Sequence, residues 1–129
     1  MKMNTADAEQ RMRSALNELQ WCLGIVVLIE AALFLFGPVS RRDFAATHMP
    51  NAIRLILGWG EIAGALLILI PRTAARGAWL LLIIFLFAIL IHLLHGMVNV
   101  GSLVIYSAAA YAVASTRSVN QNHTSVSRE

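Results

Sequence analysis

Residues 55–71 read LILGWGEIAGALLILIP, and this stretch decides the fold. It is apolar apart from Glu61, and it is long enough to cross most of a hydrocarbon layer about 30 Å thick. At about 100° per residue, Gly58, Glu61 and Gly64 fall on one face of a helix. The Gly60-x-x-x-Gly64 spacing lets a second helix approach closely, so Glu61 is predicted to face a helix-packed interior and not lipid. A carboxyl group there is costly, which makes it either a functional group or a protonated hydrogen-bonding contact between helices.

The composition is typical of an integral membrane protein. Of the 129 residues, 58% are apolar and only 13% are charged, and the mean hydropathy is +0.68. Soluble domains carry roughly 25% charged residues. The apolar residues come in blocks of about twenty, the length of a membrane-spanning helix. We therefore predict an all-α fold, a four-helix transmembrane bundle whose first partner is the lipid bilayer.

The chain divides into three predicted parts. Residues 1–18 form a polar, interfacial N-terminal segment, residues 19–114 form the membrane domain, and residues 115–129 form a disordered polar tail rich in Ser, Asn and Thr. Residues 40–51 are predicted to be a polar loop that folds over the mouth of the bundle. The four predicted spans are residues 19–36, 53–70, 77–95 and 98–114.

The basic residues indicate the orientation of the chain. The net charge is +3, and the positive-inside rule places most basic residues on the cytoplasmic side. Both termini are therefore predicted to be cytoplasmic, with Arg41, Arg42 and Arg54 on the other side. No basic patch is interleaved with aromatic residues, so nucleic acid is not an expected partner. The single cysteine, Cys22, excludes an internal disulfide and is expected to be a packing residue.

Polar residues from all four predicted spans fall at similar depth, in the outer half of the bundle. Counting about 1.5 Å per residue places them a few residues from the outer helix ends. They are predicted to converge on one polar pocket under the 40–51 loop, with Arg54 at its rim, paired with Glu30 or Glu61. Tyr106 and Trp59 are suited to its walls. The candidate pocket residues are Glu30, Arg54, Glu61, His92, Asn99 and Tyr106.

Two kinds of ligand suit such a pocket. Glu30 and Glu61 cannot both be charged cheaply in a low dielectric, which favours proton handling with His92 as a partner. A quinone or another small lipophile fits an apolar pocket with a few polar groups. A metal held by His92 and His95 is a less favoured ligand. If the pocket holds neither a lipophile nor a metal, these residues serve only in the packing of the core and the helix ends. No cofactor motif is evident, and catalysis is left open.

One stretch resembles a known family. Residues 57–73, LGWGEIAGALLILIPRT, are similar to the second-helix signature of DoxX-like membrane proteins, and Arg76, Trp79 and His92 fit the same pattern. The resemblance covers about residues 21–113 and implies a four-helix bundle in a bacterial cytoplasmic membrane. The family's namesake is a subunit of a thiosulfate:quinone oxidoreductase, and other members associate with redox and detoxifying enzymes. More distant relatives act as membrane chaperones or cargo receptors.

The chain departs from the family at the end of the first helix. A basic residue usually closes that helix, whereas this chain has Gly37-Pro38 there and carries Glu30 earlier.

Three functions follow as competing hypotheses. The favoured one is a subunit or accessory of a membrane redox system, in which Glu61 and His92 handle protons and a redox partner protein supplies electrons. The second is proton-coupled transport, in which Glu30 binds a cation as the embedded Glu of small multidrug exporters does. The third is a non-enzymatic scaffold or assembly factor whose polar residues join helices. Association into a homo-oligomer is left open.

Overall fold

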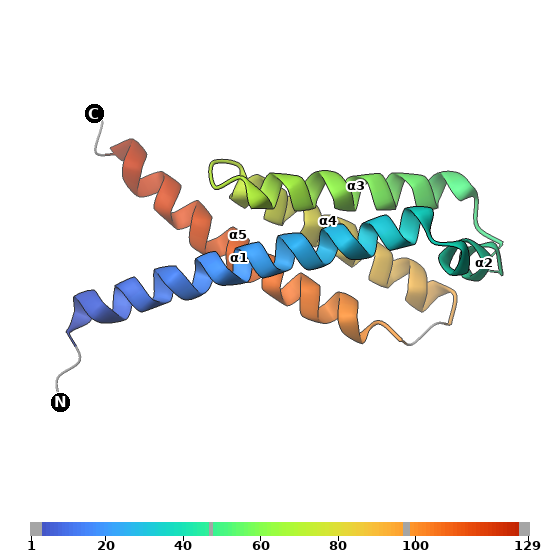
Figure 1. Ribbon diagram of the computed structural model, residues 1–129, viewed down its shortest axis with the longest axis horizontal. Helices are drawn as coiled ribbons and strands as arrows, with labels where there is room; N and C mark the ends of the chain where they lie inside the picture. The colour runs from blue at the N-terminus through green and yellow to red at the C-terminus, as the bar shows by residue number, and fades with distance from the viewer. Residues whose placement is uncertain (1–3, 47, 97–98, 127–129) are drawn as a thin grey trace.

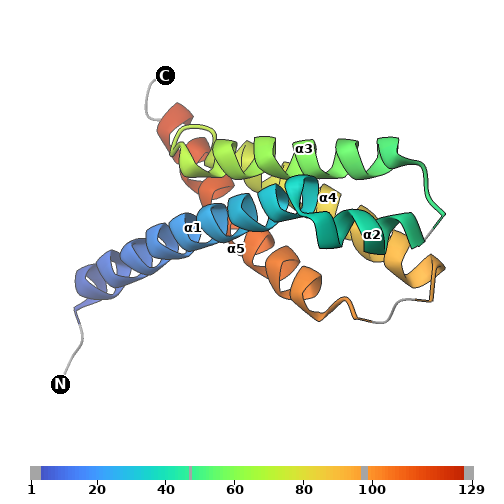
Figure 2. The same cartoon turned by 45° about the vertical axis from the view of Figure 1, so that its right-hand side comes forward.

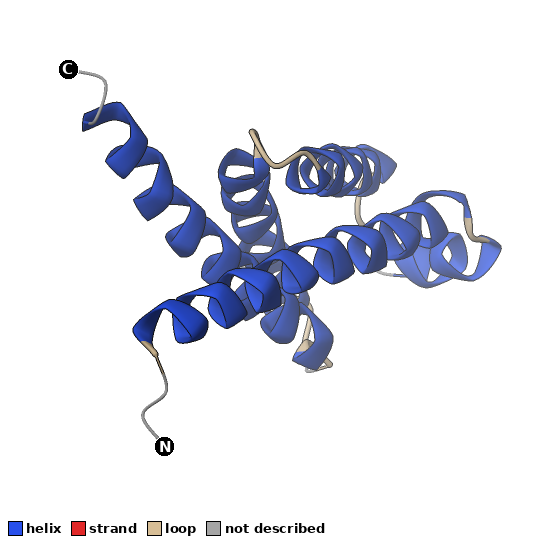
Figure 3. Cartoon of the chain, turned by 60° about the vertical axis from the view of Figure 1, so that its left-hand side comes forward, coloured by secondary structure: helices blue, strands red, loops and turns tan. Residues whose placement is uncertain are grey.

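The computed structural model describes residues 4–46, 48–96 and 99–126, and all regular structure within these ranges is helical (Figures 1 and 3). The prediction of an all-α fold is confirmed. The five helices are α1 (Thr5–Phe36), α2 (Pro38–Ala46), α3 (Asn51–Leu69), α4 (Ala74–Leu94) and α5 (Gly101–Val126).

The long helices form an antiparallel bundle (Figures 1 and 2). The main packing pairs are α1 with α3, α3 with α4, and α4 with α5. The first turns of α1 and the last turns of α5 extend beyond the α3–α4 turn and splay apart at one end, while α2 lies at the other. The start of α1 and the end of α5 therefore lie at the same end of the bundle.

Three of the described helices, α1, α3 and α4, are long and apolar enough to cross a membrane. Large apolar side chains cover their outward faces, among them Ile29, Ile56 and Ile83. A surface of this kind requires an apolar surrounding, so these helices imply a lipid bilayer. The first half of α5 is less apolar because Ser and Tyr interrupt it. The count of four spans and the cytoplasmic location of the termini stay predictions.

Glycines bring α3 and α4 together. A Cβ added at Gly77 would lie 2.6 Å from the backbone nitrogen of Ile68 and 2.8 Å from the carbonyl oxygen of Gly64. Ile84 packs over Gly60 and Leu81 packs over Gly64. The close approach predicted from the Gly60-x-x-x-Gly64 spacing is therefore made by α4.

The segment after the first span is helical, where a polar loop over residues 40–51 was predicted. The helix α1 ends at Phe36, and Pro38 begins α2 after a single residue. Proline suits the first position of a helix because it lacks the N–H that would have no partner there. The arginines and alanines that follow it are good helix formers, and this local preference outweighs the polar composition.

The polar segment from residue 115 onward also differs from the prediction of a disordered tail, because α5 continues to Val126. The hydroxyls of Ser115 and Thr116 both donate to the carbonyl of Ala112, and Ser118 donates to Ala114. Such bonds satisfy hydroxyl groups inside a helix. The end of the predicted tail, residues 127–129, lies outside the described residues.

Candidate functional site

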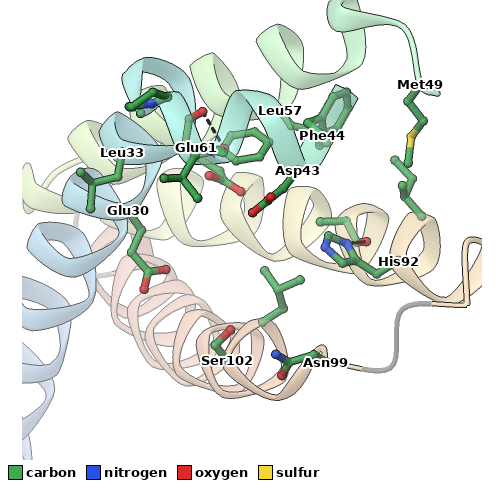
Figure 4. Close-up of a pocket in the computed structure, with 18 residues that line it drawn as sticks. Glu30, Leu33, Asp43, Phe44, Met49, Leu57, Glu61, His92, Asn99 and Ser102 are labelled. Atoms are coloured by element: carbon green, nitrogen blue, oxygen red, sulfur yellow. Dashed lines mark hydrogen bonds between the residues drawn. The ribbon is translucent and has the colours of Figure 1, made fainter. Parts of the chain in front are cut away.

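A cavity of about 730 Å³ lies between the helices at the α2 end of the bundle. All five helices contribute to its lining, and Figure 4 shows polar side chains from several of them arranged around one common space. Most of the wall is apolar, and α2 contributes more of the lining residues than any other helix. The polar lining residues are Glu30, Ser40, Asp43, Glu61, His92, Asn99 and Ser102.

Glu61 occupies the cavity because of the packing of α3 on its two neighbours. On one side Gly58 packs against Leu35 of α1, and on the other Gly64 packs against Leu81 of α4. Glu61 lies midway between these glycines in sequence and is partly buried. Its side chain therefore meets the space between the helices and not the outward face, which carries the exposed Trp59. Trp59 is not among the lining residues, so the expected wall role is not seen.

Glu30 of α1 is held by Tyr106 of α5. The phenol hydroxyl donates a hydrogen bond of 2.8 Å to Glu30 Oε1. The Tyr106 ring packs against Phe85 of α4, with the ring centroids 6.0 Å apart. Glu30 lines the cavity, whereas Tyr106 does not. Tyr106 therefore contacts the candidate site through a lining carboxyl group, and not as part of the wall.

Arg54 is placed differently from the prediction. It is buried, with 3% of its surface exposed, and it points at the end of α1. Its Nη1 donates to the carbonyls of Phe34 and Leu35, each at 3.0 Å, and its Nε donates to Asn51 Oδ1 at 2.9 Å. These bonds satisfy carbonyls that a helix C-terminus leaves without partners and place a cation at the negative end of the helix dipole. Arg54 thus closes the first helix from α3, in place of a pairing with Glu30 or Glu61 at the rim.

His92 lines the cavity with one ring nitrogen already engaged. Its Nδ1 lies 2.8 Å from the carbonyl of Ala88. Because a carbonyl only accepts, Nδ1 carries the proton, and Nε2 is the nitrogen that remains for another partner. His95 makes the equivalent bond to Ile91 at 2.9 Å but is exposed and does not line the cavity. Among the described residues, no three His, Cys, Asp or Glu side chains are grouped closely enough to hold a metal ion.

The beginning of α5 completes the lining. Asn99, just before the helix, and Ser102 in its first turn both face the cavity (Figure 4). The structure thus brings together four of the predicted site residues, which are Glu30, Glu61, His92 and Asn99. Arg54 and Tyr106 contact the elements around the cavity instead.

Sequence reasoning missed Asp43, a third carboxyl group at the cavity. Two contacts dock α2 on the end of α1: Ser40 donates to the carbonyl of Phe34 at 3.0 Å, and the rings of Phe34 and Phe44 pack edge to face at 6.1 Å. Asp43 lies next to Phe44 and is carried into the lining (Figure 4). The spacing of four residues between Ser40 and Phe44, after a proline, was the available signal of one helical face.

These observations define a small multi-pass helical membrane protein with a ligand-sized cavity at one end of its bundle. A model of the DoxX-like family matches residues 19–117, and the chain belongs to this family. No curated protein and no solved structure matches it significantly.

Proposed function

We propose that the protein binds a small lipophilic molecule in the α2-end cavity and serves as a subunit or accessory of a membrane redox system. The observation that carries this proposal is the cavity itself: about 730 Å³, mostly apolar, with a few polar groups from separate helices. Sites for small molecules have this character. The proposal includes a bacterial cytoplasmic membrane, with the cavity in the outer half.

A partner protein supplies the electrons in this proposal. The chain has one cysteine, so it cannot cycle an internal disulfide. The contribution of this chain is to hold the ligand and to exchange protons at its polar edge. Glu61 from α3 and His92 from α4 are suited to that exchange because both line the cavity.

A quinone is the first ligand to test. Its ring and tail suit apolar walls, and its two carbonyl oxygens accept hydrogen bonds. The amide of Asn99 and the hydroxyl of Ser102 are donors at the cavity edge. A carboxyl group and an imidazole beside the ring would deliver and take protons on reduction and oxidation.

The test is quinone binding by the full chain in lipid nanodiscs. A short-tailed ubiquinone analogue should bind saturably, and Glu61→Leu should weaken binding by about fivefold, the loss expected from one hydrogen-bonding group. Glu18→Leu is the matched control, because Glu18 is exposed on α1 and lies outside the cavity lining. Saturable binding that tolerates Glu61→Leu would favour a scaffold in which Glu61 only joins helices. Absence of saturable binding for every lipophile tested would overturn the proposal.

A further inference from the structure

The cavity lining is unbalanced in charge. Three carboxyl groups from three helices face it, namely Glu30, Asp43 and Glu61. Among the described lining residues there is no lysine or arginine. Arg54, on the same helix as Glu61, is turned to the carbonyls at the end of α1. The lining imidazole, His92, donates a hydrogen bond from its Nδ1 to the carbonyl of Ala88.

We infer that the preferred ligand of this cavity is a lipophilic cation: an apolar body that carries a protonated amine or a quaternary ammonium or phosphonium centre. Carboxylates beside a low-dielectric space are costly to charge unless a cation accompanies them. A ligand that brings its own positive charge removes this cost, while its apolar body fills the remaining wall. A neutral lipophile satisfies only the second requirement.

The aromatic lining is an independent observation in favour of a cation. Phe34 and Phe44 both line the cavity, and their rings meet edge to face with centroids 6.1 Å apart. Aromatic faces attract ammonium-type cations through the ring quadrupole. Asp43 directly precedes Phe44 on α2, so one short helix presents a carboxyl group and an aromatic ring to the same space (Figure 4). This combination recognises a cation that is too large to be hydrated as a point charge.

This inference rests on the proposed function, because it assumes that the cavity holds a ligand, and it specifies the charge of that ligand. It differs from the quinone hypothesis in one measurable respect. A quinone is neutral and would gain nothing from Asp43, whereas a cation would lose affinity on removal of that carboxylate.

The experiment compares two probes that have a similar shape but differ in charge. Methyltriphenylphosphonium is a cation, and triphenylphosphine oxide is a neutral molecule with the same three aryl groups. Both are titrated against the full chain in nanodiscs of zwitterionic phosphatidylcholine, which does not concentrate cations at the membrane surface. We expect the cation to bind at least about tenfold more tightly than the oxide, which corresponds to about 1.4 kcal/mol.

Variants assign the preference to the carboxyl groups. Asp43→Asn and Glu61→Gln should each weaken phosphonium binding by about fivefold or more, as for loss of a charge-assisted contact, and Asp43→Asn should leave oxide binding within about twofold. Asp7→Asn, on the exposed start of α1 and outside the cavity lining, should change neither. Because Asp43 is an exposed residue of the short helix α2, its variant keeps the test available even if Glu61→Gln fails to fold.

The outcomes separate the two proposals. If the phosphonium binds no better than the oxide, or if Asp43→Asn leaves its affinity unchanged, the inference about charge is overturned while lipophile binding stands. If neither probe nor the quinone analogue binds saturably, the proposed function fails, and the inference fails with it.

Discussion

The phenol of Tyr106 donates a hydrogen bond of 2.8 Å to Glu30 Oε1 and so joins α5 to α1 at the edge of the cavity. These residues are 76 positions apart in the sequence, and direct packing between α1 and α5 is limited compared with the α1–α3, α3–α4 and α4–α5 pairs. The bond therefore sets the orientation of a carboxyl group that the helix backbone alone would leave free to rotate.

The first prediction concerns this bond. Tyr106→Phe keeps the ring against Phe85 but removes the donor, so we expect a folded protein whose methyltriphenylphosphonium affinity falls by about threefold, as for one hydrogen bond. Tyr111→Phe is the matched control, because Tyr111 lies on the same helix, is exposed and packs against Trp79 away from the cavity. Equal effects of the two variants on binding would contradict a positioning role for Tyr106.

The second prediction concerns Arg54. Arg54→Met leaves the buried carbonyl of Leu35 without its side-chain donor and leaves the carbonyl of Phe34 with Ser40 alone, so it should lower the free energy of unfolding by about 2 kcal/mol. Arg42→Met, on the exposed surface of α2, should change it by less than about 0.5 kcal/mol. The measurement is reversible unfolding in detergent micelles. A loss no greater than that of Arg42→Met would show that the end of α1 needs no cap.

The third prediction concerns the contact between α3 and α4. A methyl group at Gly77 would meet the backbone of α3, which cannot move aside as a side chain can, so Gly77→Ala should destabilise the bundle by about 2 kcal/mol or more. Gly101→Ala is the control, because an added Cβ there meets nothing within 4 Å. Thermal unfolding of both variants is the check. If Gly77→Ala unfolds at the same temperature as the wild type, α3 and α4 do not pack this closely at Gly77.

The fourth prediction concerns a buried polar cluster at the end of the bundle opposite α2. Gln20 is fully buried; its Nε2 donates to the carbonyl of Ile68 at 2.7 Å, and its Oε1 accepts from Arg117 at 2.6 Å. A double-mutant cycle of Gln20→Leu and Arg117→Met should give a coupling free energy of about 1–2 kcal/mol. Additive effects would show that α5 is not anchored to α1 through this pair.

The fifth prediction is a pH dependence that distinguishes the ligand classes. Protons compete with a cationic ligand for carboxylate groups, so phosphonium binding should weaken as the pH falls toward the range in which carboxyl groups are protonated. Binding of triphenylphosphine oxide should change little. A phosphonium affinity that is constant, or that rises on acidification, would contradict recognition by carboxylates.

The sequence by itself determined the fold class and part of the site. Blocks of about twenty apolar residues can satisfy their backbone in lipid only as helices, and this is a local property of each block. The glycine spacing around Glu61 predicted the close contact that α4 makes. The depths of Glu30, His92 and Asn99 along their segments also follow from position in the chain, and all three line the cavity with Glu61.

Only the tertiary structure decided which polar groups meet. The two carbonyl partners of Arg54 on α1 lie 19 and 20 residues away and depend on how α3 crosses the end of α1, which no local pattern specifies. Asp43 became a lining residue because α2 is a helix docked on Phe34, where polar composition had predicted a loop. Side-chain partners depend on helix rotation and crossing, and these are set by packing between segments that are distant in the sequence.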